Sequence, residues 1–93
     1  MSYSTKTTRR LERVVKGFAN HRRIEILMLL EKEPELSVTE IAKSLDINLK
    51  TASEHIRRLA ISGLVLKRNE ANAVRHTPST TGLSILKFLR TLE

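Results

Sequence analysis

Two short helix-forming segments joined by three residues constrain this chain more than any other feature of its sequence. Ser37 followed three residues later by Glu40 has the spacing of a capping box, which starts a short amphipathic helix. Residues 46–48 then form a tight turn, and Asn48 can cap a second helix that Gly63 ends. Two short helices connected so closely predict a helix-turn-helix.

Helical periodicity predicts further helices on both sides of this motif. A first helix is expected from Thr5 to near Gly17 or Ala19, since four apolar residues share one face: Leu11, Val14, Val15 and Phe18. A second is expected over residues 21–32, with Asn20 as its cap and Pro34 after its end. A last helix follows Pro78, capped by Ser79 or Thr80, and its apolar side carries Leu83, Ile85, Leu86, Phe88, Leu89 and Leu92.

The segment after Gly63 has the pattern of a β-ribbon. Residues 64–66 and 73–74 are apolar and flank a polar stretch, which predicts two strands with a five-residue tip at 68–72. The order of elements predicts a mainly α fold with a small β-ribbon, a winged helix-turn-helix. We expect residues 1–93 to form one such domain, with 1–4 as a loose arm.

Cysteine is absent, so disulfides, thiolate zinc sites, iron–sulfur clusters and cysteine nucleophiles are excluded. The longest apolar run, residues 26–30, is far below the roughly 18 residues that span a bilayer. We therefore expect no membrane segment or signal peptide, and a cytoplasmic location. No nucleophile–base pair, glycine-rich phosphate loop or metal triad is visible, so an enzyme is not expected.

Basic residues outnumber acidic ones by 17 to 10, and they are unevenly spread along the chain. Residues 1–23 and 49–76 have a basic excess, whereas residues 24–48 are acidic. Such a distribution in a small domain indicates nucleic acid as a partner, although a soluble domain could carry the same charge on a mixed surface.

The second helix of the motif has the composition of a DNA-reading helix. If Ala52, Ile56 and Leu59 face the core, polar residues at its start face outward and can reach base edges or phosphates. The candidates are Asn48, Lys50, Thr51, Ser53, Glu54, Arg57 and Arg58. For Glu54 the alternative is an ordinary surface ion pair with Arg58. The ribbon adds Arg68, Asn69 and Arg75, of types that contact phosphates or enter a minor groove.

Three segments resemble a known family. Residues 21–27 resemble the second helix of the ArsR/SmtB group of small bacterial and archaeal repressors. Residues 49–65 resemble that family's recognition helix running into the wing, and residues 79–82 resemble a Thr-x-x-Gly entry to the last helix. The resemblance implies a repressor that binds double-stranded DNA as a homodimer on a palindromic operator.

In that family the first and last helices pack across the dimer. The surplus apolar residues on these helices are therefore the candidate dimer interface: Leu11, Val14, Val15, Phe18, Ile85, Phe88, Leu89 and Leu92. A small core that gains stability from a partner supports the same inference.

The chain departs from the family's metal sensors at residues 35–40. Those sensors carry Glu-Leu-Cys-Val-Cys-Asp there, whereas this chain has Glu-Leu-Ser-Val-Thr-Glu. Hydroxyls replace both thiolates, so a soft metal has no ligands. His21 and Glu25 share a helical face, but two ligands are too few for a tight site, and His55 is expected to pack or to contact phosphate.

We therefore expect no metal and no cofactor. An effector, if there is one, would be a small molecule or another protein. The alternatives to a specific regulator are a winged-helix protein-interaction module and a non-specific DNA-binding protein.

Overall fold

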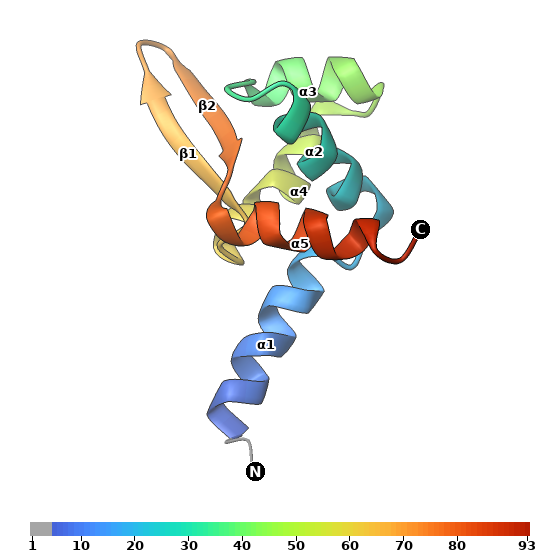
Figure 1. The fold of residues 1–93 in the computed structure, drawn as a ribbon. Helices are drawn as coiled ribbons and strands as arrows, with labels where there is room; N and C mark the ends of the chain where they lie inside the picture. The colour runs from blue at the N-terminus through green and yellow to red at the C-terminus, as the bar shows by residue number, and fades with distance from the viewer. Residues whose placement is uncertain (1–4) are drawn as a thin grey trace.

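The computed structural model describes residues 5–93, which form five helices and a two-stranded hairpin (Figure 1). The elements are α1 (Thr5–Phe18), α2 (His21–Lys32), α3 (Val38–Leu45), α4 (Leu49–Ile61), β1 (Val65–Glu70), β2 (Ala73–Pro78) and α5 (Thr80–Arg90). This order confirms the predicted winged helix-turn-helix. The loose arm expected over residues 1–4 lies outside the described residues.

Side-chain caps begin four of the helices. Asn20, Asn48 and Ser79 each accept hydrogen bonds from backbone amides of the following turn. Ser37 and Glu40 form a complete capping box: the Ser37 hydroxyl accepts from the Glu40 amide, and the Glu40 carboxylate accepts from the Ser37 amide. These contacts satisfy donors that a helix leaves without partners, so the predicted starting points are confirmed.

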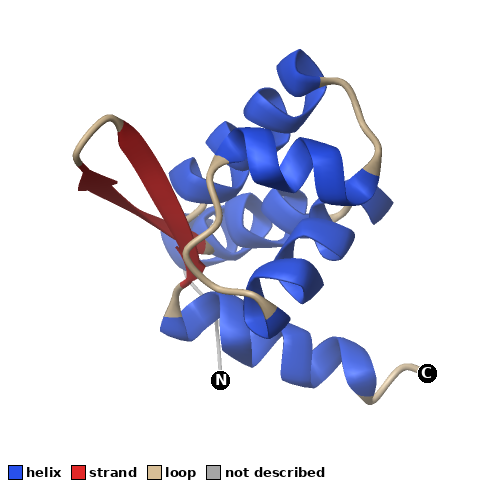
Figure 2. Cartoon of the chain, turned by 90° about the horizontal axis from the view of Figure 1, so that it is seen from above, coloured by secondary structure: helices blue, strands red, loops and turns tan. Residues whose placement is uncertain are grey.

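The core is aliphatic and centres on α2. Its largest fully buried side chains come from every helix except α1 and from the residue that leads into the hairpin: Ile26, Leu27, Leu30, Ile41, Ile56, Leu59, Leu64 and Leu86. Each contributes about 1.5–3 kcal/mol by leaving water. Figure 2 shows the helices packed together, with the hairpin to one side.

The predicted five-residue tip of the wing is wrong. Strands β1 and β2 pair in antiparallel register from Val65↔Pro78 to Glu70↔Ala73, so residues 71 and 72 alone make the turn. Ala71 adopts a left-handed φ of 53° there. All residues of β1 after Val65 are exposed. A strand that is exposed to solvent on both faces has no alternation of apolar and polar residues from which its length can be predicted.

Helix α1 extends away from the body (Figure 1). Its buried residues are Gly17 and Phe18 at its C-terminal end, which packs against α2 and α4. No helix within residues 5–93 has the length and apolar character needed to cross a membrane.

Candidate nucleic-acid interface

The outer face of α4 carries the residues proposed to read DNA. Ala52, Ile56 and Leu59 are buried, as predicted, so the opposite side of the helix is open to solvent. The residues on that side are exposed: Lys50, Thr51, Ser53, Glu54 and Arg57. Asn48 caps the first turn, where its Oδ1 accepts from the amides of Lys50 at 2.8 Å and Thr51 at 3.3 Å.

Glu54 forms hydrogen bonds with both Arg57 and Arg58. Arg57 donates to its two carboxylate oxygens at 3.1 and 2.8 Å, and Arg58 Nε donates at 3.1 Å. These bonds, that of Arg57 above all, lower the pKa of Glu54 to about 2. The alternative surface pair between Glu54 and Arg58 is therefore present in the structure, and Arg57 belongs to it too.

The wing arginines bind carboxylates on the body of the protein and within the wing itself. Arg75 donates to Glu40 at 3.1 Å and to Glu70 at 3.3 Å, while Arg68 donates to Glu35 at 2.8 Å. The contacts with Glu40 and Glu35 link the hairpin to α3 and to the segment that enters it. Their role in DNA contact stays a prediction.

The wing and α4 enclose a hollow of about 430 Å³. Ser53 and Ile56 line it from the helix, and Lys67 and Asn69 line it from the wing. The side chains of Lys67 and Asn69 have no hydrogen bond or ion pair to any other described residue. The structure thus places one predicted helix residue, Ser53, close to one predicted wing residue, Asn69.

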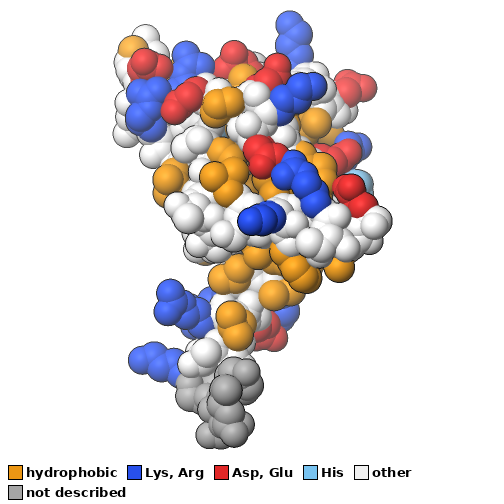
Figure 3. All heavy atoms as spheres, viewed as in Figure 1, with side chains coloured by type: hydrophobic (Ala, Val, Ile, Leu, Met, Phe, Trp, Pro, Cys, Tyr) orange, Lys and Arg blue, Asp and Glu red, His pale blue; other side chains and the backbone are white. Residues whose placement is uncertain are grey.

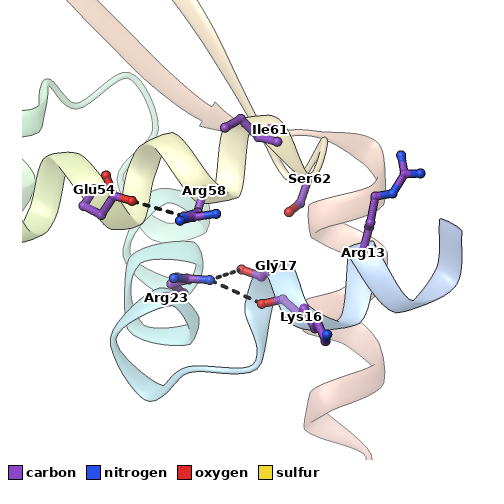
Figure 4. Close-up of a pocket in the computed structure, with 8 residues that line it drawn as sticks. All are labelled: Arg13, Lys16, Gly17, Arg23, Glu54, Arg58, Ile61 and Ser62. Carbon is purple, nitrogen blue, oxygen red and sulfur yellow. Dashed lines mark hydrogen bonds and ion pairs between the residues drawn. The ribbon is translucent and has the colours of Figure 1, made fainter. Parts of the chain in front are cut away.

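A second hollow of about 530 Å³ lies on the other flank of α4, where α1 and α2 meet it (Figure 4). Arg23 crosses this space: its Nη1 donates to the carbonyls of Lys16 at 3.3 Å and Gly17 at 3.5 Å. Its Nε donates to His55 Nδ1 at 3.2 Å. Burial, and then the charge of Arg23, lowers the pKa of His55.

The sequence pattern does not single out the basic residues of this second hollow. Arg13 and Lys16 belong to the basic first helix, for which the sequence leaves open a solvated face or a flanking phosphate contact. Arg23 stands out only as part of a family-like segment. The basic excess of residues 1–23 is the one signal that points to them. It could not place these side chains beside Arg58, because that contact depends on how α1 and α2 pack against α4.

The expected dimer face is partly used by the fold itself. Phe18 lies in the core, and Val14, Ile85 and Leu89 pack against it. The residues left open are Leu11, Val15, Phe88 and Leu92, with exposed fractions of 55%, 52%, 54% and 66%. Figure 3 shows hydrophobic side chains along α1 and where this helix joins the body.

His55 and His76 both contact other groups of the protein. His76 is buried, and its Nδ1 lies 2.8 Å from the Leu36 carbonyl. Among residues 5–93, no three His, Asp or Glu side chains come close enough together to hold a metal ion.

Comparison with known proteins identifies relatives of this chain. The family described as bacterial regulatory protein, arsR family, matches residues 20–67. The transcriptional activator HlyU of Vibrio cholerae is 40% identical over 68 residues, which cover 73% of this chain and 62% of that protein. The chain therefore spans less than two thirds of this curated relative.

Solved structures share the fold over almost the whole chain. HlyU from Vibrio cholerae N16961 superposes with a TM-score of 0.81 at 33% identity, covering 96% of this chain and 97% of that chain. The homodimeric winged helix-turn-helix DNA-binding domain of Mb0332 from Mycobacterium bovis, a possible ArsR-family transcriptional regulator, has a TM-score of 0.81 at 30% identity. That match covers 99% of this chain and 88% of the other.

Proposed function

This chain belongs to the arsR family of bacterial regulatory proteins, and from that premise we propose that it is a sequence-specific, double-stranded DNA-binding transcriptional regulator. The observation that carries the proposal is the outer face of α4, where polar residues are exposed beside a fixed N-terminal turn. A helix of this form fits the major groove, with its N-terminal residues nearest the base edges.

Each group on this face has a chemical role in the proposal. Lys50 and Arg57 donate to guanine or to phosphate, Ser53 donates or accepts, and Glu54 accepts from a cytosine amino group. The wing residues Arg68, Asn69 and Arg75 contact phosphates or the adjacent minor groove.

We propose a homodimer as the DNA-binding form. The open apolar side chains of α1 and α5 support this, and the related domain of Mb0332 is described as homodimeric. A two-fold dimer reads an inverted repeat whose half-sites lie about 10 base pairs apart, centre to centre. If each protomer contacts about 4 phosphates, log affinity falls against log salt with a slope of about −7.

We propose repression as the effect on transcription, because occupying a promoter requires only the DNA-binding and dimer surfaces described above. HlyU carries the name of an activator, so the direction needs its own measurement. A reporter placed behind the selected operator should lose expression when the protein is present. A rise in expression would overturn this part of the proposal.

The operator can be found by selecting a random duplex library on the purified protein at about 150 mM salt, where non-specific binding is weak. We expect enrichment of an inverted repeat. Retention without enrichment would instead make the protein a non-specific DNA binder, and no retention would favour the protein-interaction module.

Paired variants then test the helix face. The double variant Lys50→Gln/Arg57→Gln should lose operator affinity by at least about 100-fold while its circular dichroism is unchanged. The matched control is Lys32→Gln/Lys43→Gln, which removes two exposed charges outside this face. Equal losses for the two variants would exclude α4 as the reading helix.

A further inference from the structure

We propose that the basic hollow between α1, α2 and α4 binds a phosphate of the DNA backbone. This inference rests on the proposed function and adds a second contact region to it. Four cationic side chains and one carboxylate line the hollow: Arg13, Lys16, Arg23, Arg58 and Glu54 (Figure 4).

The cations here lack sufficient negative partners. Glu54 is shared between Arg58 and Arg57, and Arg23 donates only to carbonyl oxygens and to a histidine nitrogen. Arg13 has no ion pair to any other described residue. Lys16 pairs with Glu12 at 3.4 Å, but both of these side chains are largely exposed, so the pair is weak.

An oxyanion is the ligand that this arrangement favours. Guanidinium groups present several N–H donors in a plane, which matches the spacing of phosphate oxygens. The Ser62 hydroxyl lines the same hollow and adds another donor. A concave site with a net positive charge concentrates anions more strongly than a flat surface does.

The position of the hollow on α4 indicates which backbone strand of the duplex it meets. At about 100° per residue, Glu54 and Arg58 lie on one flank of the helix, while Ser53 and Ile56, which line the wing-side hollow, lie on the other. Lys50 and Arg57 lie between these flanks. A helix in the major groove has a backbone strand on each side, so the basic hollow meets the strand opposite the wing.

The continuity of the charge favours DNA over a small phosphorylated molecule. Lys50, Glu54 and Arg58 follow one another at i, i+4 along α4, so the hollow adjoins the proposed reading face. The basic residues of α1 extend the same positive region beyond the hollow: Lys6, Arg9, Arg13 and Lys16 share one helical face. A polyanion that runs past the helix can contact the whole of this surface.

The double variant Arg13→Gln/Lys16→Gln tests the site, with Lys32→Gln/Lys43→Gln as its control. The control removes two exposed charges that lie outside both the hollow and the basic face of α1. Circular dichroism and sedimentation establish that both variants fold and assemble as the wild type does. Affinity is then measured at several salt concentrations for the selected operator and for random duplex.

The hollow variant should bind operator and random duplex about tenfold more weakly, with a salt slope shallower by about 1 per protomer. The control should stay within about twofold of the wild type, since its charges lie outside the contact. Equal behaviour of the two variants overturns the proposal, whether both weaken or neither does.

Two further readouts separate a contact with the DNA backbone from a site for a small anion. Ethylation of one phosphate per half-site, opposite the wing, should weaken wild-type binding and leave the hollow variant unaffected. If instead inorganic phosphate binds the wild type but not the variant, and DNA affinity is equal in both, the hollow serves a small ligand and the proposal fails. If the wild type selects no operator but its random-duplex affinity still depends on the hollow, only the specific function is refuted.

Discussion

Glu54 determines how much positive charge the reading face of α4 presents in the free chain. Its carboxylate accepts from Arg57 and Arg58 together, and the bond from Arg57 contributes most to its lowered pKa of about 2. A carboxylate whose pKa is lowered on folding stabilises the folded state above its ordinary pKa of 4.5. That contribution is lost as the pH falls from 4.5 toward about 2.

Replacing Glu54 by Gln should raise affinity for random duplex by about fivefold at low salt, because two arginines lose their shared counter-charge. Affinity for the operator should rise less, so the ratio of specific to non-specific binding falls. Fluorescence anisotropy with both duplexes measures this ratio. Glu33→Gln is the control, since it removes an exposed carboxylate that has no side-chain ion pair within residues 5–93. A ratio that stays constant would exclude Glu54 from specificity.

Gly17 allows α1 to approach α4 closely. A Cβ atom at this position would lie 2.2 Å from Ser62 Oγ and 2.4 Å from Ser62 Cβ, so one helix would have to move.

Gly17→Ala should therefore lower the free energy of unfolding by about 1–2 kcal/mol, since overpacking outweighs the better helix propensity of Ala. Urea denaturation measures the loss. Ser62→Gly removes the obstructing atoms, so it should cost less in the Gly17→Ala background than in the wild type. Additive effects would mean that the two residues do not clash.

At the scale of elements, the wing is attached to the body through His76. Its amide donates to the Leu36 carbonyl at 3.0 Å, and its own carbonyl accepts from the Glu35 amide at 2.8 Å. The buried ring adds the contact between Nδ1 and the Leu36 carbonyl. Burial lowers the pKa of His76 from its ordinary 6.5, although the Leu36 contact acts in the opposite direction.

This burial predicts a pH-dependent stability. Below pH 6.5 the unfolded chain protonates His76 while the folded chain resists, so the wild type loses stability until the pH reaches the lowered pKa. His76→Gln should reduce the difference in the free energy of unfolding between pH 7.5 and pH 5.5, a range chosen around the ordinary pKa of histidine. Urea titrations at both pH values test this, with His21→Gln, which removes an exposed histidine, as the control. An unchanged difference would show that His76 does not contribute.

At the scale of the whole molecule, the chain is elongated because α1 projects from the body (Figure 1), and its principal extents are 48 × 30 × 21 Å. Leu11 and Val15 are exposed on this helix, and Phe88 and Leu92 are exposed on and just after α5. Large apolar side chains on a projecting helix favour an interface with a second copy of the chain.

Leu11→Glu/Val15→Glu should convert the proposed dimer into a monomer, since charged carboxylates would have to be desolvated in the interface. Sedimentation should show the lower mass, and operator affinity should fall by at least about 100-fold because the half-sites are then bound independently. The control is Leu66→Glu, which places one carboxylate on an exposed residue of the wing. This variant should keep the mass of the dimer in sedimentation. A double variant that stays dimeric would place the interface elsewhere.

The sequence by itself determined where the capped helices begin, where α2 and α4 end, and which face of α4 is buried. The capping pairs, Pro34 and Gly63 act on residues within one turn of themselves, so their effects could be predicted locally. Gly63 has a left-handed φ of 75° where the chain leaves α4, which accounts for the helix ending there. The burial of Ala52, Ile56 and Leu59 follows from helical periodicity alone.

Only the tertiary structure decided which distant groups meet. Arg75 and Glu40 are 35 residues apart in the chain, and Arg23 and His55 are 32 apart, yet each pair forms a hydrogen bond. The length of the wing likewise depended on pairing between two exposed strands. Such contacts depend on how the helices and the hairpin pack against one another, and local propensity contains no information about that packing.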